Sequence, residues 1–369
     1  MIDKLNFSVL IAPLDWGLGH ATRCVPIISH LIKSGCKVVI ATEGVQQNLL
    51  KREFPDLQFI HLKGYHIQYA KRKRWFSLKI MLQLPKIWRS IKKEKSWLDH
   101  YLQHSPVDMI ISDNRYGLYH QKIPCVIMTH QLQIKAPFAL AEKLMQLVHY
   151  NMLKNFTACW VPDTKGEPNI AGTLSHPKTL PSIPVSYIGP LSRFNESKQV
   201  TKDVFLLIVL SGPEPQRSIL ENLLISQLKT FPKKVLLVRG LPENAETIKV
   251  NSNITVKNHL TAIELESAFL RAEYIVSRSG YTTIMDIIKL KKKAVLIPTP
   301  GQTEQEYLAD HLHKQGWCMS SKQENLNILK LIEEVEKFEF KHLEIDMNTY
   351  QKTINEFISN KYYYALGKS

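Results

Sequence analysis

The sequence predicts an α/β protein made of two doubly wound units, each with a parallel sheet covered by helices. Apolar runs of strand length alternate with stretches of helical periodicity in both halves of the chain. A polar stretch, residues 191–203, follows Gly189-Pro190 and separates the two alternating sets. The length of 369 residues exceeds what one typical core requires, and a hydrophobic content of 44% is enough to fill two cores.

The first half begins with an apolar run, residues 8–12, that has the length of a buried strand. Gly17 and Gly19 interrupt the pattern, and apolar residues then recur at helical spacing over 20–33. Further strands are expected at 37–41, 57–62, 109–112, 125–129, 158–161 and 185–188, with a helix at 46–52. Because strands and helices alternate, the strands should pair in parallel, with their carboxyl ends at one edge.

The second half repeats this alternation after the polar stretch. Strands are expected at 204–210, 234–238, 254–257, 272–277 and 294–298, and helices at 217–228, 261–270, 282–290 and 304–315. The tail over 350–366 is amphipathic. We therefore expect a first domain over residues 1–195, a second over 196–349, and a C-terminal helix, 350–369, that packs back on the first.

The cysteine pattern and the hydropathy of the sequence indicate the cellular compartment. The five cysteines are scattered without a C-x-x-C pair, which suits the reduced cytosol better than a disulfide framework. No stretch reaches about 18 apolar residues, the length of a transmembrane helix, and the N-terminus has no secretory pattern. We expect a cytoplasmic protein.

The net charge of +15 is concentrated in residues 71–95, which hold ten Lys or Arg and one Glu. The same stretch carries Trp75 and Trp88, and Pro85 should kink or split its helix. Basic residues among Trp and aliphatic side chains are typical of a surface that lies on anionic lipid. This reading places the protein peripherally on the inner face of the cytoplasmic membrane. The alternative is the solvated face of an ordinary helix whose Trp side chains turn inward.

Nucleic acid is the other class of partner that a basic patch suits. No DNA- or RNA-binding motif accompanies the charge, so no nucleic-acid partner is expected.

Gly17 and Gly19 stand between the first strand and the first helix, with His20 and Arg23 in the first helical turn. Paired glycines allow close backbone approach, and a helix N-terminus presents free N–H groups, so this loop suits an anion or a polar substrate. Thr22 stands where a dinucleotide fingerprint has its third glycine, and Glu43 stands near the place of its ribose-binding acid. The alternative is that the glycines serve helix-start geometry alone and His20 is an ordinary polar residue.

Three further polar residues of the first half should lie at the same sheet edge. Asp113 and Arg115 follow the strand at 109–112, and His130 follows the strand at 125–129. We expect them, with Arg23, to contact a substrate. Loop capping by Asp113 and a surface position for His130 are the alternatives.

Three loops of the second half follow predicted strands and so should meet at one edge. Hydroxyls, guanidinium groups and helix-start N–H groups suit a diphosphate, and a carboxylate such as Asp286 suits ribose hydroxyls. Each loop taken alone has the composition of an ordinary turn. Three such loops at one edge of the sheet indicate a ligand site. The loops contribute Ser211, Gly212 and Arg217; Arg278, Ser279, Gly280 and Thr282; and Gln302 and Gln305.

The sequence lacks the motifs of several other kinds of site. The histidines form no ligand-spaced set and no D-x-D occurs, so no metal site is expected. No Walker A, G-x-S-x-G or H-E-x-x-H motif is present.

The segment "GLGHATR" (residues 17–23) and the stretch over 277–316 resemble the glycosyltransferase family 28 group. The resemblance implies two Rossmann-like domains facing a cleft, the GT-B fold. It also implies a nucleotide-sugar donor, usually a UDP-sugar, held mainly by the second half with no cofactor and no obligatory metal.

The resemblance assigns roles by position. It places His20 next to the reacting sugar and Asp286 at the ribose-binding acid, where the family more often has Glu. Glu306 stands where the family has the second of a glutamine pair, and "LSGPEPQR" replaces its usual first donor loop. The remaining assignments are Ser211 and Gly212 in the first donor loop, His259 and Leu260 at the base, Ser279, Gly280 and Thr282 at the diphosphate, and Gln305 near the sugar.

These observations predict a metal-independent, inverting glycosyltransferase. His20 is the candidate general base for the acceptor hydroxyl, because an imidazole titrates near neutral pH. Backbone N–H groups at the Ser279-Gly280 helix start, with Arg217 or Arg278, would offset the charge of departing UDP. The acceptor is expected to be a lipid-linked or cell-envelope glycan.

Two alternatives remain. A "G-x-G-H-x-x-R" start also occurs in a related hydrolase that cleaves UDP from an amino-sugar nucleotide. A sugar-nucleotide-binding subunit without chemistry of its own is the other. Reaction products distinguish transfer from hydrolysis.

Overall fold

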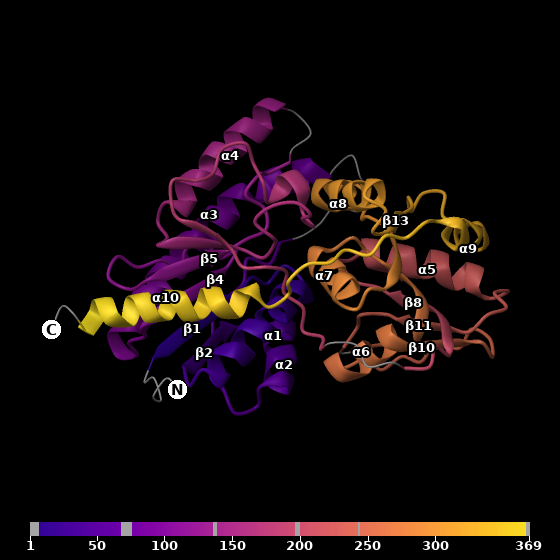
Figure 1. Ribbon diagram of the computed structural model, residues 1–369, viewed down its shortest axis with the longest axis horizontal. Coiled ribbons are helices and arrows are strands. Elements are labelled where there is room, and N and C mark those ends of the chain that lie inside the picture. The colour runs from indigo at the N-terminus through magenta and orange to yellow at the C-terminus, as the bar shows by residue number, and fades with distance from the viewer. Residues whose placement is uncertain (1–6, 68–75, 136–138, 196–199, 243, 367–369) are drawn as a thin grey trace. The chain divides into compact units, whose positions relative to one another are not determined.

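The computed structural model describes residues 7–67, 76–135, 139–195, 200–242 and 244–366, which form two compact units (Figure 1). The first unit holds Leu82–Leu191 together with the chain up to Ile67 and from Ile345 onward. Ser192–Glu344 form the body of the second. The polar stretch expected to separate the halves includes residues 196–199, which lie outside the described residues.

The first unit is built on a seven-stranded sheet whose strands all run parallel, in the order β3-β2-β1-β4-β5-β6-β7. Val9, Leu10 and Ile11 of β1 are fully buried, as central strands covered on both faces require. The strands are β1 (Ser8–Pro13), β2 (Lys37–Thr42), β3 (Gln58–His61), β4 (Met109–Asp113), β5 (Cys125–Met128), β6 (Ala158–Val161) and β7 (Val185–Tyr187).

The helices of the first unit include two that differ from expectation. The long α3 runs on through Pro85, so of the two outcomes expected at Pro85, a kink or a split, the split is wrong. The helix α4 was not expected, and several of its apolar residues face solvent rather than the core. The helices are α1 (Leu18–Lys33), α2 (Gly44–Glu53), α3 (Phe76–His104), α4 (Ala139–Leu153), a short 3₁₀ turn, Gly172–Leu174, and α10 (Thr349–Leu366).

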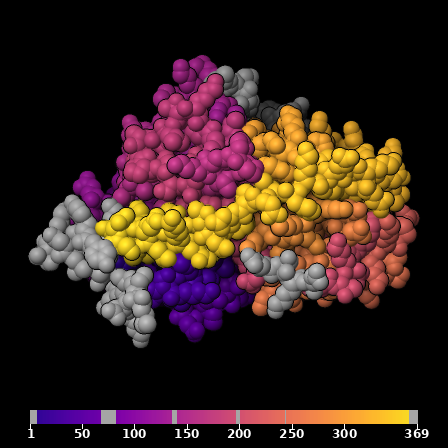
Figure 2. Space-filling model, in the orientation of Figure 1, coloured from indigo at the N-terminus to yellow at the C-terminus, as the bar shows by residue number. Residues whose placement is uncertain are grey.

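The C-terminal helix α10 packs on the first unit, where Figure 2 shows it as a yellow band. His30 of α1 lies 2.9 Å from Asn355, between ring Nε2 and amide Oδ1. The Tyr350 ring meets the His30 ring edge-on at 5.9 Å between centroids. Ile354 and Ile358 are buried at one helical spacing. The chain thus crosses the second unit and finishes on the first.

The second unit is built on a six-stranded parallel sheet in the order β10-β9-β8-β11-β12-β13. Its strands are β8 (Val204–Val209), β9 (Val235–Val238), β10 (Ile254–Lys257), β11 (Ala272–Ser277), β12 (Lys293–Leu296) and β13 (Met319–Ser320). Its helices are α5 (Gln216–Leu228), α6 (Ala262–Arg271), α7 (Tyr281–Lys289), α8 (Thr303–Lys314) and α9 (Ile328–Lys337). The very short β13 and the helix α9 had no expected counterpart.

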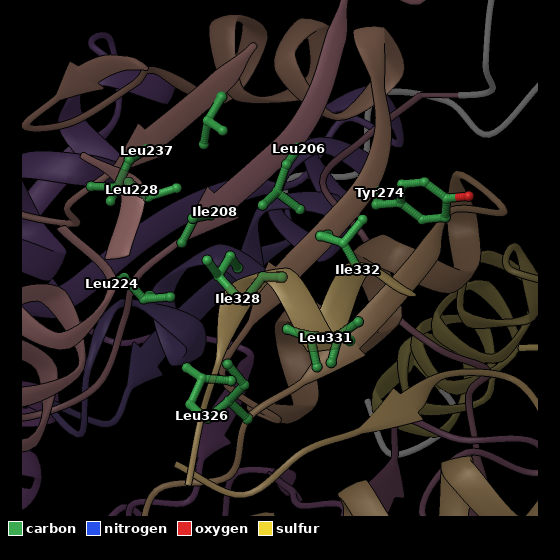
Figure 3. Packing of buried hydrophobic residues seen from close by; sticks show 14 of the residues in the cluster. Leu206, Ile208, Leu224, Leu228, Leu237, Tyr274, Leu326, Ile328, Leu331 and Ile332 are labelled. Atoms are coloured by element: carbon green, nitrogen blue, oxygen red, sulfur yellow. The ribbon is translucent and has the colours of Figure 1, made fainter. Parts of the chain in front are cut away.

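One face of this sheet packs against α5 and α9, as Figure 3 shows. Each of these side chains is at least nine-tenths buried, and burying a Leu or Ile contributes about 1.5–3 kcal/mol. The labelled core residues are Leu206 and Ile208 of β8, Leu237 of β9, Tyr274 of β11, Leu224 and Leu228 of α5, Leu326 before α9, and Ile328, Leu331 and Ile332 of α9.

Each sheet reverses its strand order at one point, between β1 and β4 in the first and between β8 and β11 in the second. In open parallel sheets, ligands bind outside the carboxyl ends of the strands at this switch point. A ligand site in each unit is therefore expected in the loops after these four strands.

Candidate functional site

A histidine and a carboxylate meet at the switch point of the first sheet. His20 lies in the first turn of α1, directly after β1, and Asp113 is the last residue of β4. His20 Nδ1 lies 2.9 Å from Asp113 Oδ2. Asp113 is fully buried, whereas the His20 side chain keeps 14% of its surface exposed. The pair therefore has a buried carboxylate behind an accessible imidazole.

Two groups contact Nδ1 of His20: the Asp113 carboxylate, which can only accept, and Arg23 Nη2 at 2.9 Å, which can only donate. An ionised carboxylate has only lone pairs to offer, so a close contact with Nδ1 is favourable when Nδ1 carries the hydrogen and donates it. The Nε2 atom then keeps its lone pair. Within the described part of the chain Nε2 has no hydrogen-bond partner. The contact with the carboxylate favours the tautomer in which Nδ1 carries the hydrogen and Nε2 is the basic nitrogen.

Arg23 clamps Asp113 from the next turn of α1. Its Nε lies 2.9 Å from Asp113 Oδ2 and its Nη2 bonds Asp113 Oδ1. Its Nη1 lies 3.3 Å from His130 Nδ1. The guanidinium is only 2% exposed. The structure thus places Arg23 and His130 behind His20, a position that favours holding the carboxylate over direct contact with phosphates or acceptor.

The charges of this cluster shift both pKa values. Burial raises the pKa of Asp113, but the Arg23 charge and the hydrogen bonds from His20 and Arg23 outweigh it and hold this pKa below its ordinary value. Burial lowers the pKa of His20, and the nearby Arg23 charge lowers it further against the opposing effect of Asp113. At neutral pH the pair is a carboxylate next to a neutral imidazole.

The glycine loop before α1 has a conformation that its glycines allow. Gly17 has φ of 81°, in the left-handed region that favours glycine, and a Cβ there would meet no atom within 4 Å. Its backbone is fixed, because its N–H donates to Asp15 O at 3.0 Å and its carbonyl accepts from Gln46 Nε2 at 3.3 Å. Gly19 accepts from Thr22 Oγ1 at 3.0 Å. Gly17 thus leaves open space at the start of α1, and the hydrogen bonds of Gly17 and Gly19 fix the backbone there.

Arg115 lies apart from this cluster, in a second buried ion pair. Its Nε lies 2.7 Å from Glu94 Oε1, and its other nitrogens bond the carbonyls of Pro13 and Lys63. Glu94 also accepts from Tyr65 Oη at 2.8 Å. Arg115 is 1% exposed. We expected an acceptor contact, and this arrangement favours instead a role in holding α3 against the sheet.

In the second unit, the loop after β8 carries Gly212, with φ of 96°, where a Cβ would come 4.0 Å from Thr299 Oγ1. The neighbouring Arg217 is engaged by carboxylates: Nε lies 2.6 Å from Glu214 Oε1, and Nη1 bonds Glu221 Oε2. Glu221 also pairs with the buried Arg239. The Arg217 guanidinium thus ties the loops after β8 and β9 together.

Arg278 and Ser279, at the end of β11, are turned toward backbone carbonyls. Arg278 donates to the carbonyls of Gln216 at 2.8 Å, Pro298 at 3.2 Å and Ile297 at 3.3 Å. Burial lowers its pKa to about 10. Ser279 Oγ donates to Gln305 O at 2.8 Å. These side chains join three loops at one edge, next to the backbone at the start of α7.

Gly280, Thr282 and Asp286 lie at the start of α7 and within it. Gly280 is its N-cap with φ of −72°, and a Cβ there would meet nothing within 4 Å. Asp286 is buried and accepts from Ser192 Oγ at 2.6 Å. Burial raises its pKa to about 6, despite the nearby Arg193 charge. A ribose would have to replace Ser192 as the partner of this carboxylate.

The remaining predicted donor contacts lie in the loops after β10 and β12. His259 and Leu260 follow β10 and are half-buried. Gln305 is buried and its Oε1 accepts from the Thr299 N–H at 2.9 Å. Gln302 is the N-cap of α8. Ser211 follows β8 and is half-buried. The second unit thus gathers the predicted donor residues at the carboxyl edge of its sheet.

Three acidic residues that lie near the His20 cluster or hold Arg115 were not among the predicted site residues: Asp15, Glu43 and Glu94. Asp15 accepts the backbone N–H of Tyr65 and of His66, both at 2.8 Å. Glu43 Oε1 lies 2.8 Å from His66 Nε2. Glu43 was noted only as a position in the dinucleotide fingerprint. The adjacency of Asp15 to the glycine pair was the available signal, whereas the partner loop lies some fifty residues away.

Among the described residues, no group of three His, Cys, Asp or Glu side chains is arranged to hold a metal ion. The five cysteines are buried and free, and burial raises the pKa of Cys159 and of Cys318 to about 12.

Residues 211–361 match the model of the glycosyltransferase family 28 C-terminal domain. The chain is 23% identical over 345 residues to a Clostridium perfringens protein, covering 88% of this chain and 89% of that one. That relative is UDP-N-acetylglucosamine--N-acetylmuramyl-(pentapeptide) pyrophosphoryl-undecaprenol N-acetylglucosamine transferase. A Clostridium botulinum protein of the same name is 22% identical over 326 residues and 84% of each chain.

Solved structures share the fold. The glycosyltransferase of kitacinnamycin has a TM-score of 0.62 at 14% identity, covering 90% of each chain. The calicheamicin glycosyltransferase CalG4 has 0.60 at 13% identity, covering 97% of this chain and 95% of that one. MurG of Acinetobacter baumannii has 0.52 at 15% identity, covering 94% and 92%. The predicted α/β class with two Rossmann-like domains of the GT-B type is confirmed, as is the resemblance to the family 28 group.

Proposed function

We propose that this chain, a glycosyltransferase whose second half carries the family 28 C-terminal domain, transfers a sugar from a UDP-sugar to an acceptor hydroxyl without a metal. The observation that carries the proposal is the 2.9 Å contact of His20 Nδ1 with the buried Asp113 at the first switch point. It supplies a general base where an open α/β sheet binds its ligand.

The proposed reaction is a single displacement. His20 Nε2 takes the proton of the acceptor hydroxyl while that oxygen forms a bond to the anomeric carbon of the donor sugar. The bond from the anomeric carbon to the UDP oxygen breaks, and UDP leaves with the electron pair. Asp113 stabilises the imidazolium that forms. The direct attack inverts the anomeric carbon.

The departing diphosphate requires positive electrostatic potential in the second unit. With Arg278 engaged by carbonyls, the backbone N–H groups at the start of α7, where the helix dipole favours an anion, are the proposed partners of the diphosphate. Gly280 supports this assignment because the space where its side chain would stand is open. Asp286 is the proposed ribose contact, with Ser192 displaced from it.

Insertion of a side chain at Gly280 tests the donor site. Gly280→Val should weaken UDP binding at least about tenfold, because the new side chain fills the space through which the diphosphate approaches α7. The free protein should keep its stability, since φ of −72° is open to any residue and a Cβ meets no neighbour within 4 Å. UDP titration by calorimetry and the rise of Tm with UDP measure the change.

Gly166→Val is the matched control, because Gly166 also has open space around a Cβ but lies in a loop of the first unit. It should bind UDP as the wild type does. Asp286→Ala should also weaken UDP binding through the loss of ribose hydrogen bonds. Unchanged UDP affinity in both Gly280→Val and Asp286→Ala would rule out this donor site. A panel of nucleotide sugars in the same assay identifies the preferred base and sugar.

The acceptor is proposed to be lipid-linked. The name of the clostridial relatives specifies an acceptor joined through a pyrophosphoryl group to undecaprenol, and they match this chain over more than four-fifths of its length. The first unit supports the proposal through an exposed apolar and basic surface on α3. Its apolar members are Leu82, Leu84 and Trp88, which are 73%, 42% and 44% exposed.

This surface belongs to the basic stretch over 71–95 that the sequence marked, of which residues 71–75 lie outside the described residues. Arg89, Lys92 and Lys93 are exposed on the same helix. The neighbouring helix in sequence, α4, exposes Leu140, Leu144 and Leu147. Exposed apolar side chains next to basic ones suit attachment to an anionic bilayer surface.

Among the residues that the structure describes, no helix combines the length and the apolar composition that crossing a bilayer requires.

Vesicle binding tests the membrane proposal. The protein should co-sediment with vesicles rich in phosphatidylglycerol and not with neutral phosphatidylcholine vesicles. Replacing Arg89, Lys92 and Lys93 by Ser should weaken the partition coefficient about 100-fold, because each basic residue contributes about 1 kcal/mol at an anionic surface. Salt should weaken the wild-type binding as well.

The matched control replaces Lys229, Lys322 and Lys330 by Ser, three exposed lysines of the second unit. This variant loses the same charge and should keep its vesicle binding and its affinity for UDP. If the wild type fails to sediment with anionic vesicles at low salt, α3 is a solvated surface and the acceptor is a soluble molecule.

A further inference from the structure

A tryptophan lies exposed beside the candidate base. Trp16 is 39% exposed, although an indole is among the most costly side chains to leave in water. It stands four residues before His20, in the loop between β1 and α1. No part of the proposed proton transfer uses it.

The loop that carries Trp16 is held firmly on both sides. Asp15 Oδ1 accepts from the Tyr65 N–H and Oδ2 from the His66 N–H, both at 2.8 Å. A Cβ on Gly64 would fall 2.4 Å from Asp15 Cγ, so this partner segment packs tightly against Asp15. Gly17, on the other side of Trp16, is fixed by Asp15 O and by Gln46. The exposure of Trp16 is therefore a feature of an ordered backbone.

Polar side chains surround the segment that anchors this loop. Glu43 Oε1 accepts from the Gly64 N–H at 2.6 Å and lies 2.8 Å from His66 Nε2. His61 Nε2 lies 3.5 Å from Glu43 Oε2. The imidazoles of His66 and His61 are 57% and 72% exposed. These residues bring carboxylate and imidazole groups to the loops that follow β1, β2 and β3.

An exposed aromatic ring, in a loop bonded to a segment that carries carboxylate and imidazole groups, fits a pyranose. The C–H face of a sugar ring packs on an aromatic face, and its hydroxyls bond to polar side chains in fixed positions. A rigid platform costs little conformational entropy on binding.

We propose that Trp16 is the acceptor-sugar platform of this enzyme, on which the ring that carries the attacking hydroxyl stacks, with His66 and Glu43 at its rim. The proposal deepens the proposed function and rests on it. Trp16 would position the acceptor hydroxyl beside His20 Nε2, and the donor site of the second unit would not depend on it.

The first test is kinetic, with a water-soluble acceptor that carries the N-acetylmuramyl pentapeptide diphosphate on a short isoprenyl chain. Trp16→Ala should raise the acceptor KM about 10-fold or more through the lost stacking, with the Kd for UDP unchanged. Trp16→Phe should retain most of the affinity. Trp16→Leu is apolar but has no aromatic face, and should behave as Trp16→Ala does.

Leu180→Ala is the matched control, since Leu180 is an apolar side chain of the first unit that is exposed to a similar extent, 48%, and lies outside the α3 surface. It should leave the KM of the short-chain acceptor unchanged. An acceptor KM within about twofold of wild type in Trp16→Ala, or a full rescue by Trp16→Leu, would overturn the aromatic platform.

The second test does not require turnover. Titration of the same acceptor analogue should change the tryptophan fluorescence of the wild type, and the change should disappear in Trp16→Phe. If the protein hydrolyses the donor instead of transferring its sugar, the proposed function fails while this titration still decides the binding role of Trp16. No difference between the wild type and Trp16→Phe would refute that role.

Discussion

Replacing His20 by alanine is expected to lower kcat by about 10²–10⁴-fold, the range that a positioned general base supplies. The side chain is the accessible imidazole of a pair whose carboxylate, Asp113, is fully buried. Its loss leaves the acceptor hydroxyl without a proton acceptor at the reacting position. Initial-rate kinetics of UDP release with donor and acceptor measure the effect, and the Kd for UDP should stay near that of the wild type.

The pH dependence of the wild type sharpens this prediction. Burial and Arg23 lower the pKa of His20 from 6.5, so the neutral, basic form persists as the pH falls through that value. The acidic limb of kcat/KM, which reports the free enzyme, should therefore lie below pH 6.5 and vanish in His20→Ala. His104→Ala, an exposed histidine of α3, is the matched control and should keep the wild-type profile. Turnover near that of the wild type in His20→Ala would remove His20 from the mechanism.

The second large effect is expected from Asp113→Asn. An amide in this place can donate to Nδ1, which stabilises the tautomer with the proton on Nε2 and so occupies the basic nitrogen. We expect kcat to fall about 10²–10⁴-fold. Arg23, 2% exposed, would also lose its anionic partner, and breaking a buried ion pair from one side costs about 3–5 kcal/mol of stability. Denaturant unfolding and kcat are the two measurements.

A double variant separates the two consequences. Arg23→Gln with Asp113→Asn removes both charges and should recover much of the stability that Asp113→Asn loses, since no buried charge remains unpaired. It should not recover kcat, because the histidine tautomer stays wrong. Recovery of kcat together with stability would mean that Asp113 only holds the fold and plays no part in the chemistry.

The fold could be predicted from the sequence because its signal is local. The apolar runs that became β1, β4, β8 and β11 are bounded by glycine or polar residues, and their positions differ from the structure by at most one residue. The helix α4 was missed although Leu140 and Leu144 stand four residues apart, at helical spacing; in the structure both face solvent. The continuity of α3 through Pro85 escaped because proline normally interrupts a helix.

The sequence predicted which residues lie at the site better than it predicted which way their side chains point. A polar residue after a strand lies at the carboxyl edge, and this rule brought His20 and Asp113 to one place. It does not say whether a side chain turns outward or inward. Arg23 and Arg278 carry charges that suit a phosphate, yet both turn inward, one to Asp113 and one to backbone carbonyls. Such pairings join residues up to about ninety positions apart and have no local signature.

The central claim is that His20 and Asp113 activate an acceptor hydroxyl for transfer, and product analysis tests it most directly. The full chain would be incubated with a UDP-sugar labelled in the sugar, in the presence and absence of the diphosphate-linked acceptor analogue. We predict that the label moves to the acceptor with release of one UDP per glycoside, and that His20→Ala abolishes this transfer while still binding UDP. Label recovered as free sugar with UDP, at a rate that the acceptor does not change, would show a hydrolase and contradict the claim.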